Sequence, residues 1–182
     1  MWRERLAKHD KLALYRTFKM HLCLEEYLLS PDVKGRSAMT RVRVGTNELL
    51  VEQMRYQKEG RDDHCRMCGV EAEDVTHVML HCEAYDELRG KTLTDISKAT
   101  NRAIDVIQME SDGARMHGLI GSGVGLDFKM RRACYAAVLR YITAVLLKRR
   151  VGIDVSRRRL LQRRSRARRT GGKLMGLALL WP

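Results

Sequence analysis

Four residues that can bind a metal ion lie close together in this chain, in the order Cys65, Cys68, His77 and Cys82. Their pattern is C-x2-C-x8-H-x4-C. Zinc prefers thiolate and imidazole ligands in a tetrahedral arrangement, and two thiolates separated by two residues can bind one ion from a tight turn. Gly69 directly after the second cysteine suits such a turn. The pattern therefore predicts a zinc knuckle with Zn2+ as a structural cofactor, because four protein ligands leave no coordination position for water.

The spacing of the last two ligands sets a geometric condition. We expect residues 75–81 to be helical, and at about 100° per residue His77 and Cys82 would point roughly 140° apart. Cys82 should therefore lie on a loosened last turn of the helix. His81, four residues after His77, is the rival fourth ligand, and His64 is a weaker one. We favour Cys82, because a thiolate is the better partner for two other thiolates.

The remaining cysteines favour a different role. The chain has five cysteines, an odd number, and no apolar stretch follows its basic beginning, so we expect no secretory signal and a reducing compartment. Cys23 and Cys134 lie on expected helix faces and are interpreted as core residues. A chance gathering of buried cysteines is the alternative interpretation of the knuckle. It leaves unexplained why three of the five cysteines lie so close to two histidines.

The apolar pattern predicts a mainly α fold: a small helical domain with the embedded C-C-H-C knuckle, a long C-terminal helix and a basic tail. We divide the chain into an N-terminal helical segment, a zinc-binding knuckle region, a Gly-containing linker, a long amphipathic helix and an Arg-rich tail, at residues 1–36, 37–96, 97–126, 127–150 and 151–182.

Individual boundaries follow from local signals. Pro31 and Gly35 predict a break after the N-terminal helices. Residues 38–44 fit either a helix capped by Ser37 or a short strand, and we favour the helix. Asp127 should cap the long helix, which we expect to end near residue 150. No window has the roughly 20 consecutive apolar residues that span a bilayer.

Charge is concentrated at the C-terminal end. The chain carries 35 Lys and Arg against 22 Asp and Glu, a net charge of +13. Residues 148–182 hold 12 of these cations and one acid, Asp154, which is typical of an arm that contacts the backbone of RNA or DNA. The expected contact residues are Arg149, Arg150, Arg157, Arg158, Arg159, Arg163, Arg164, Arg166, Arg168 and Arg169. A solvated tail, a nuclear-import signal and an anionic-membrane arm are alternatives, and residues 171–182 differ from the rest and are interpreted as an extension.

The knuckle and its flanks also resemble a known family. Residues 41–46, 49–55, 65–69, 76–82 and 85–89 are similar, in order and type, to the zinc-binding region at the C-terminal end of non-LTR (LINE-like) retrotransposon reverse transcriptases. The resemblance covers roughly residues 40–90 and implies the same four metal ligands. It departs from the family in two places: Val44-Gly45-Thr46 follows the arginine in place of the usual Thr-Gly-His, and no proline follows Cys82.

The resemblance does not extend to polymerase chemistry. The full-length relatives are RNA-directed DNA polymerases, but Asp62-Asp63 lies in a charged loop and is a poor match to a catalytic pair. We therefore expect no enzyme activity from this chain. We expect a nuclear, non-catalytic zinc-dependent module, part or derivative of a retrotransposon polyprotein, that binds template RNA or target DNA. The alternative is a domesticated or fragmentary protein-interaction module that binds its partner through helix 128–150 and uses the tail for import.

Overall fold

The part of the chain that is described is mainly helical. The computed structural model describes residues 2–9, 12–19, 24–51, 63–102, 110–120 and 126–175. These residues form helices and turns with no strand among them, apart from one isolated bridge between His64 and Ala72. The mainly α prediction is therefore confirmed. The chain divides into two compact units, Met1–Leu146 and Leu147–Pro182, which are described separately below.

Short helices open the first unit. They are α1 (Trp2–Ala7), α2 (Ala13–Phe18) and the 3-10 turn η2 (Glu26–Leu29). The last two each bury one aromatic side chain, Phe18 and Tyr27, in the core. Cys23, which we interpreted as a core residue, lies outside the described residues.

Helix α3 (Val33–Arg43) begins earlier than the sequence indicated. The expected start at Ser37 is wrong, because Asp32 caps the helix: its carboxylate accepts a hydrogen bond from the backbone of Gly35 at 2.8 Å. Gly35 does not extend a break but lies inside the helix, where a Cβ would come within 2.7 Å of the Cβ of Leu139. Glycine at this position lets α3 pass close to the helix that carries Leu139.

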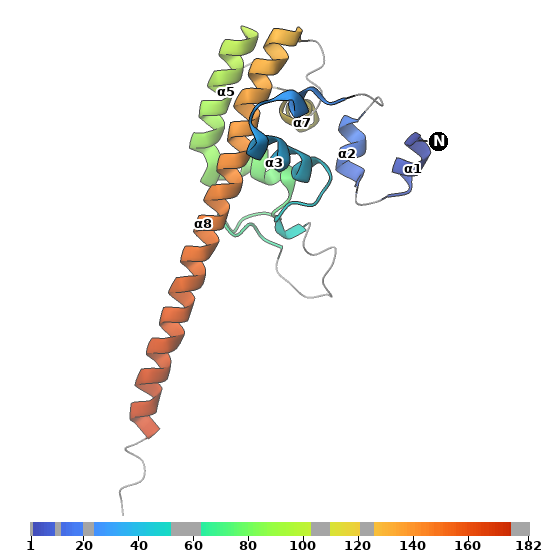
Figure 1. Cartoon of the computed structure of the whole chain (residues 1–182). Helices are drawn as coiled ribbons and strands as arrows, with labels where there is room; N and C mark the ends of the chain where they lie inside the picture. Colours follow the sequence, from blue (N-terminus) through green and yellow to red (C-terminus); the bar gives the residue numbers. More distant parts are fainter. Residues whose placement is uncertain are drawn as a thin grey trace, which may run out of the picture. The chain divides into compact units, whose positions relative to one another are not determined.

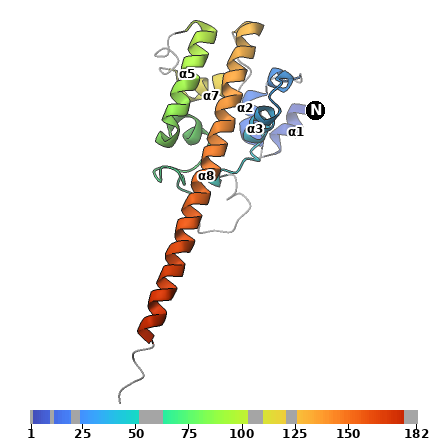
Figure 2. The ribbon, with the colours of Figure 1, turned by 60° about the vertical axis from the view of Figure 1, so that its left-hand side comes forward.

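Helix α5 (Asp86–Thr100) runs beside the first part of the C-terminal helix in both ribbon views (Figures 1 and 2). An ion pair between Arg140 and Asp95, at 3.2 Å, joins the two helices. Helix α5 ends at Asn101, which adopts a left-handed conformation with φ of 53°.

We expected a Gly-containing linker at residues 97–126, but two parts of this range are helical. Its first residues belong to α5, and α7 (Asp112–Ile120) lies inside it. Met116, Leu119 and Ile120 of α7 are buried, at the spacing of one helical face. Several glycines in this region concealed that spacing. Residues 103–109 and 121–125 lie outside the described residues.

The C-terminal helix α8 (Phe128–Met175) begins where the sequence predicted. The carboxylate of Asp127 accepts a hydrogen bond from the backbone N–H of Met130 at 2.8 Å. In the first unit, the apolar face of α8 is buried in the core, including Val138, Ile142 and the predicted core cysteine Cys134. Most of the apolar face of residues 128–146 is thus covered within its own unit, whereas Phe128 at its start is exposed.

The long C-terminal helix is confirmed, but its expected end near residue 150 is wrong. Helix α8 continues to Met175, so most of the expected Arg-rich tail is helical. Arginine, leucine, glutamine and alanine all have good helix propensity, and no proline interrupts residues 151–175. In the second unit the helix therefore gives the arginine run a regular backbone.

The core of the first unit surrounds the predicted metal ligands. It joins residues from α3, α7 and the first part of α8 with the segment that carries the ligands. Met39, Val78, Leu139 and Ile142 are buried at its centre. Cys65 and Cys82 belong to the same buried cluster, so the metal-ligand segment is built into the helical core.

Candidate metal centre

The first two cysteines lie on a tight hairpin turn. The backbone N–H of Cys65 donates to the carbonyl of Glu71 at 2.6 Å, and the N–H of Gly69 donates to the carbonyl of Cys65 at 2.7 Å. Gly69 has a φ of +76°, a left-handed conformation that glycine adopts without strain. The turn expected after Cys68 is thus present.

The other two ligands flank a widened helical turn. Asp74 starts the turn by accepting a hydrogen bond from the backbone N–H of His77 at 2.7 Å. Residues His77–His81 form the π-turn η3, and the N–H of Cys82 donates to the carbonyl of His77 at 2.7 Å. A bond between residues five apart closes a wider turn than an α-helix does. The loosened last turn that the ligand spacing required is therefore present, as a π-turn over His77–His81.

The four predicted ligands come together. Their donor atoms, from Cys65, Cys68, His77 and Cys82, all lie within 4.8 Å of one another and could hold a metal ion. The sulfurs of Cys65 and Cys82 are 3.8 Å apart, and the sulfur of Cys68 lies 3.3 Å from Nε2 of His77. All four cysteines that the structure describes are free thiols.

The rival histidines are placed elsewhere. His81 is not one of the clustered residues, and its Nε2 lies 2.6 Å from the carboxylate of Asp112 in α7. The side chain of His64 is exposed, with its Nδ1 3.8 Å from the carboxylate of Asp63. The preference for Cys82 over both histidines thus agrees with the arrangement of the cluster.

A carboxylate that the sequence argument missed orients His77. Oε2 of Glu71 lies 2.9 Å from Nδ1 of His77. With a proton on Nδ1, the imidazole donates to this carboxylate and its Nε2 lone pair is directed at the cysteines. Glu71 could not be singled out from sequence, because only the hairpin turn brings it back over the histidine.

Distant side chains hold the carbonyls of the widened turn. The hydroxyl of Tyr141, in α8, donates to the carbonyl of Met79 at 2.7 Å. The guanidinium of Arg89, in α5, donates to the carbonyl of Cys82 at 2.5 Å. Both bonds satisfy backbone carbonyls near the end of a helical turn, where no further backbone N–H of the helix is available to donate to them. The turn is thereby fixed to the two long helices of its unit.

Glu73 ties the knuckle to the preceding segment. Its side chain is fully buried, and its carboxylate accepts a hydrogen bond from the backbone N–H of Leu50 at 3.0 Å. The backbone N–H of Glu73 in turn donates to the carbonyl of Asp63 at 2.8 Å. A buried carboxylate is stable only when it is hydrogen bonded, so these contacts fix the position of the hairpin.

The pKa values of the three thiols shift in two directions: those of Cys65 and Cys82 are raised and that of Cys68 is lowered. Burial raises the pKa of Cys82 to about 12, and the charge of Cys65 adds to the rise. Burial also raises the pKa of Cys65. At Cys68 burial opposes ionisation, but the backbone N–H of Val70 and the side chain of His77 lower the pKa to about 7. Because a metal ion binds thiolates rather than thiols, loading the cluster must release protons from the two buried cysteines.

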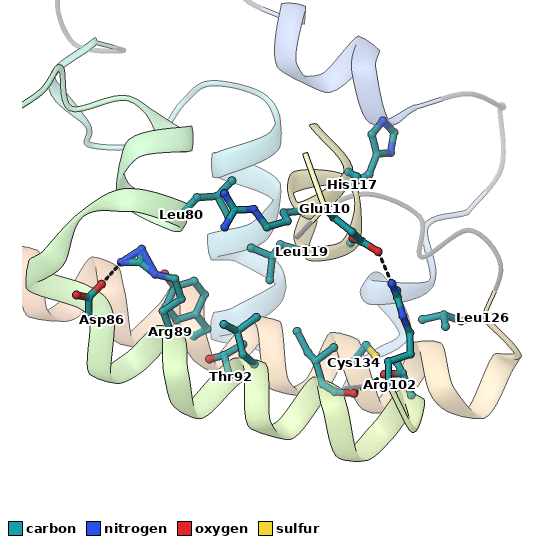
Figure 3. A pocket seen from close by; sticks show the side chains of 17 residues that line it. Leu80, Asp86, Arg89, Thr92, Arg102, Glu110, His117, Leu119, Leu126 and Cys134 are labelled. Carbon is teal, nitrogen blue, oxygen red and sulfur yellow. Dashed lines mark hydrogen bonds and ion pairs between the residues drawn. The ribbon is translucent and has the colours of Figure 1, made fainter. Parts of the chain in front are cut away.

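A separate cavity of about 550 Å³ lies between α5, α7 and α8 (Figure 3). Its walls include Leu119, Leu126 and Cys134. Two of its guanidinium groups are already paired with carboxylates: Arg89 with Asp86 at the end nearer Leu80, and Arg102 with Glu110 (Figure 3). The lining thus combines apolar side chains with charges that are paired within the cavity wall.

The predicted nucleic-acid contacts all lie on α8, in the second unit. Arg150 and Arg158 are exposed. Arg149 is only 2% exposed, so we do not count it among the cations that a ligand can reach. The side chains of Arg157, Arg159, Arg163, Arg164, Arg166, Arg168 and Arg169 lie outside what the structure describes.

Two further findings bear on function. Over the described residues, no helix is both long enough and apolar enough to cross a membrane. Comparison of the chain with protein-family models, curated proteins and solved structures found no match.

Proposed function

We propose that the chain is a non-catalytic module in which one structural Zn2+ holds the knuckle and the arginine-rich part of α8 binds nucleic acid. The distances within the cluster are the main support for zinc. With Zn–S bonds of about 2.3 Å and Zn–N bonds of about 2.05 Å, tetrahedral geometry places two sulfurs about 3.8 Å apart and sulfur and nitrogen about 3.6 Å apart. Here one sulfur pair, Cys65 and Cys82, is 3.8 Å apart, the sulfur of Cys68 is 3.3 Å from Nε2 of His77, and all four donor atoms lie within 4.8 Å of one another.

The donor set supports a structural role for the ion. Three thiolates and one imidazole complete the four-coordinate shell that zinc prefers, which leaves no position for a substrate or an activated water. The carboxylate of Glu71 on the far nitrogen of His77 is the usual outer partner of a zinc-bound histidine. Held in this way, the ion would join the hairpin to the widened turn and contribute directly to folding.

The charge on α8 supports nucleic acid as the partner. Between residues 148 and 169 the chain carries 11 Lys or Arg and a single acid, Asp154. Arginine predominates, and its planar guanidinium can donate two parallel hydrogen bonds to a phosphate. The similarity of the knuckle region to non-LTR retrotransposon reverse transcriptases supports the same partner and suggests descent from such a polyprotein.

Replacing Glu71 with alanine should weaken zinc binding by roughly 10–100-fold, the usual cost of losing an outer partner of a metal-bound histidine. Competition with a chelating dye measures this affinity. The matched control is Glu87→Ala, which removes an exposed glutamate of α5 outside the cluster and should leave zinc affinity unchanged. Equal losses in the two variants would show that Glu71 acts only through its charge and does not orient His77.

Nucleic-acid binding should depend steeply on salt. If the helix contacts six or more phosphates, affinity should fall by about a thousandfold or more between 50 and 200 mM salt, because bound counterions are released from the nucleic acid. Fluorescence anisotropy with labelled RNA and DNA at the two salt concentrations provides the measurement. A flat salt response, or no binding at 50 mM, would remove the basis of the proposal.

A further inference from the structure

We propose that the helix formed by residues 147–175 binds in the major groove of double-stranded DNA. This inference rests on the proposed function and names the class of nucleic acid. Helix α8 remains helical through the whole arginine run, residues 157–169. An unstructured arm could follow any polyanion, whereas a helix presents its cations at fixed spacing and needs a ligand of matching shape.

The cationic positions surround the helix instead of forming one face. Successive positions in an α-helix differ by about 100°, so the run Arg157-Arg158-Arg159 alone spans about 200°. The adjacent pairs 163–164 and 168–169 widen the distribution further. A helix that lies on a membrane surface needs one continuous apolar face opposite its charges. This distribution instead fits a ligand with phosphates on two sides of the helix.

The dimensions favour B-form DNA. An α-helix with its side chains is about 10–12 Å across, and the B-DNA major groove is about 12 Å wide with a phosphate backbone along each edge. The deep groove of A-form RNA is too narrow for side chains to read. Residues 157–169 would extend about 20 Å at 1.5 Å per residue, a length that a straight helix can place in one groove segment.

The composition of the helix argues against single strands. Proteins that bind single-stranded nucleic acid commonly stack bases on aromatic side chains. Residues 147–175 contain no Phe, Tyr or Trp. Their only acid is Asp154, which lies before the densest part of the arginine run. Phosphate contact along a groove is therefore the interaction that this segment can make best.

The first test compares four ligands with the full, zinc-loaded chain at one ionic strength. They are a mixed-sequence DNA duplex, an RNA duplex of the same sequence, the single DNA strand, and vesicles of anionic phospholipid. We expect the DNA duplex to bind at least tenfold more tightly than each other ligand. Equal or tighter binding to RNA or single strands would overturn this inference while leaving the proposed function intact. Binding to vesicles alone, or to none of the ligands, would overturn both.

The second test separates helix from charge. Leu161→Pro keeps every cation but interrupts the helix, and position 161 belongs to the second unit, whereas the knuckle belongs to the first. We expect duplex binding to fall at least tenfold in Leu161→Pro and to stay within twofold in the control Leu161→Ala. A DNA duplex whose major groove is filled by glucosylated hydroxymethylcytosine should lose binding to the same extent. Unchanged binding in either experiment would overturn the groove assignment.

Discussion

Replacing Cys82 with alanine should abolish stoichiometric zinc binding, whereas replacing His81 with alanine should leave it intact. The sulfur of Cys82 lies 3.8 Å from that of Cys65 inside the cluster, while His81 is paired with Asp112 outside it. Zinc content by mass spectrometry, on protein purified without a histidine tag, distinguishes the two variants. Equal zinc contents would mean that His81 can replace Cys82, and would contradict the ligand assignment.

The size of the effect follows from what the ion would contribute. Apparent binding free energies of structural zinc in small fingers are about 10–16 kcal/mol at neutral pH. Loss of a direct ligand should therefore cost more affinity than the roughly 10–100-fold expected for an outer partner. Because Cys65 and Cys82 belong to the buried core, the Cys82 variant should also melt at a lower temperature, with or without added zinc.

Changing the eight arginines between residues 157 and 169 to glutamine should reduce duplex DNA affinity at 50 mM salt by more than a thousandfold. Glutamine has good helix propensity, so the change removes charge and preserves the helix. Zinc content and melting temperature should stay as they are, because the core of the first unit lies within residues 1–146. Fluorescence anisotropy and thermal melting followed by circular dichroism are the measurements.

The matched control replaces the same eight arginines with lysine. Lysine keeps the charge, so the slope of affinity against salt should be retained even if some bidentate phosphate contacts are lost. Unchanged affinity in the glutamine variant would mean that nucleic acid binds elsewhere on the chain. It would leave the zinc site unaffected, because the two proposals are tested by different measurements.

The candidate metal cluster could be predicted from sequence because its chemistry is local. Ligand types and spacing identified Cys65, Cys68, His77 and Cys82, and simple helix geometry required a distorted turn between the last two. The N-cap of α8 at Asp127 was predictable for the same reason. Each of these features depends on residues that lie within one short stretch of sequence, 18 residues for the cluster and four for the N-cap.

Contacts between residues that lie far apart in the sequence could not be predicted. Arg43 follows a pattern typical of a solvated cation, yet it is fully buried, 2.9 Å from Glu25 and 5.2 Å from the centre of the Tyr27 ring. Burial opposes ionisation of Glu25, but Lys19 and Arg43 hold its pKa below the ordinary value. Gly35 is similar, since its requirement for glycine arises from Leu139 on another helix.

The hydrogen bond from Tyr141 to Met79 has a consequence for how this knuckle can be used. Many zinc fingers are autonomous: a short peptide cut from its parent chain folds around the ion and can be grafted onto another protein. Here the turn that carries His77 accepts a hydrogen bond from the hydroxyl of a residue 62 positions downstream in the sequence. A peptide that contained only the knuckle would keep all four candidate ligands but would lose the hydrogen bond from Tyr141. We therefore expect the candidate metal site to form only within the whole helical domain.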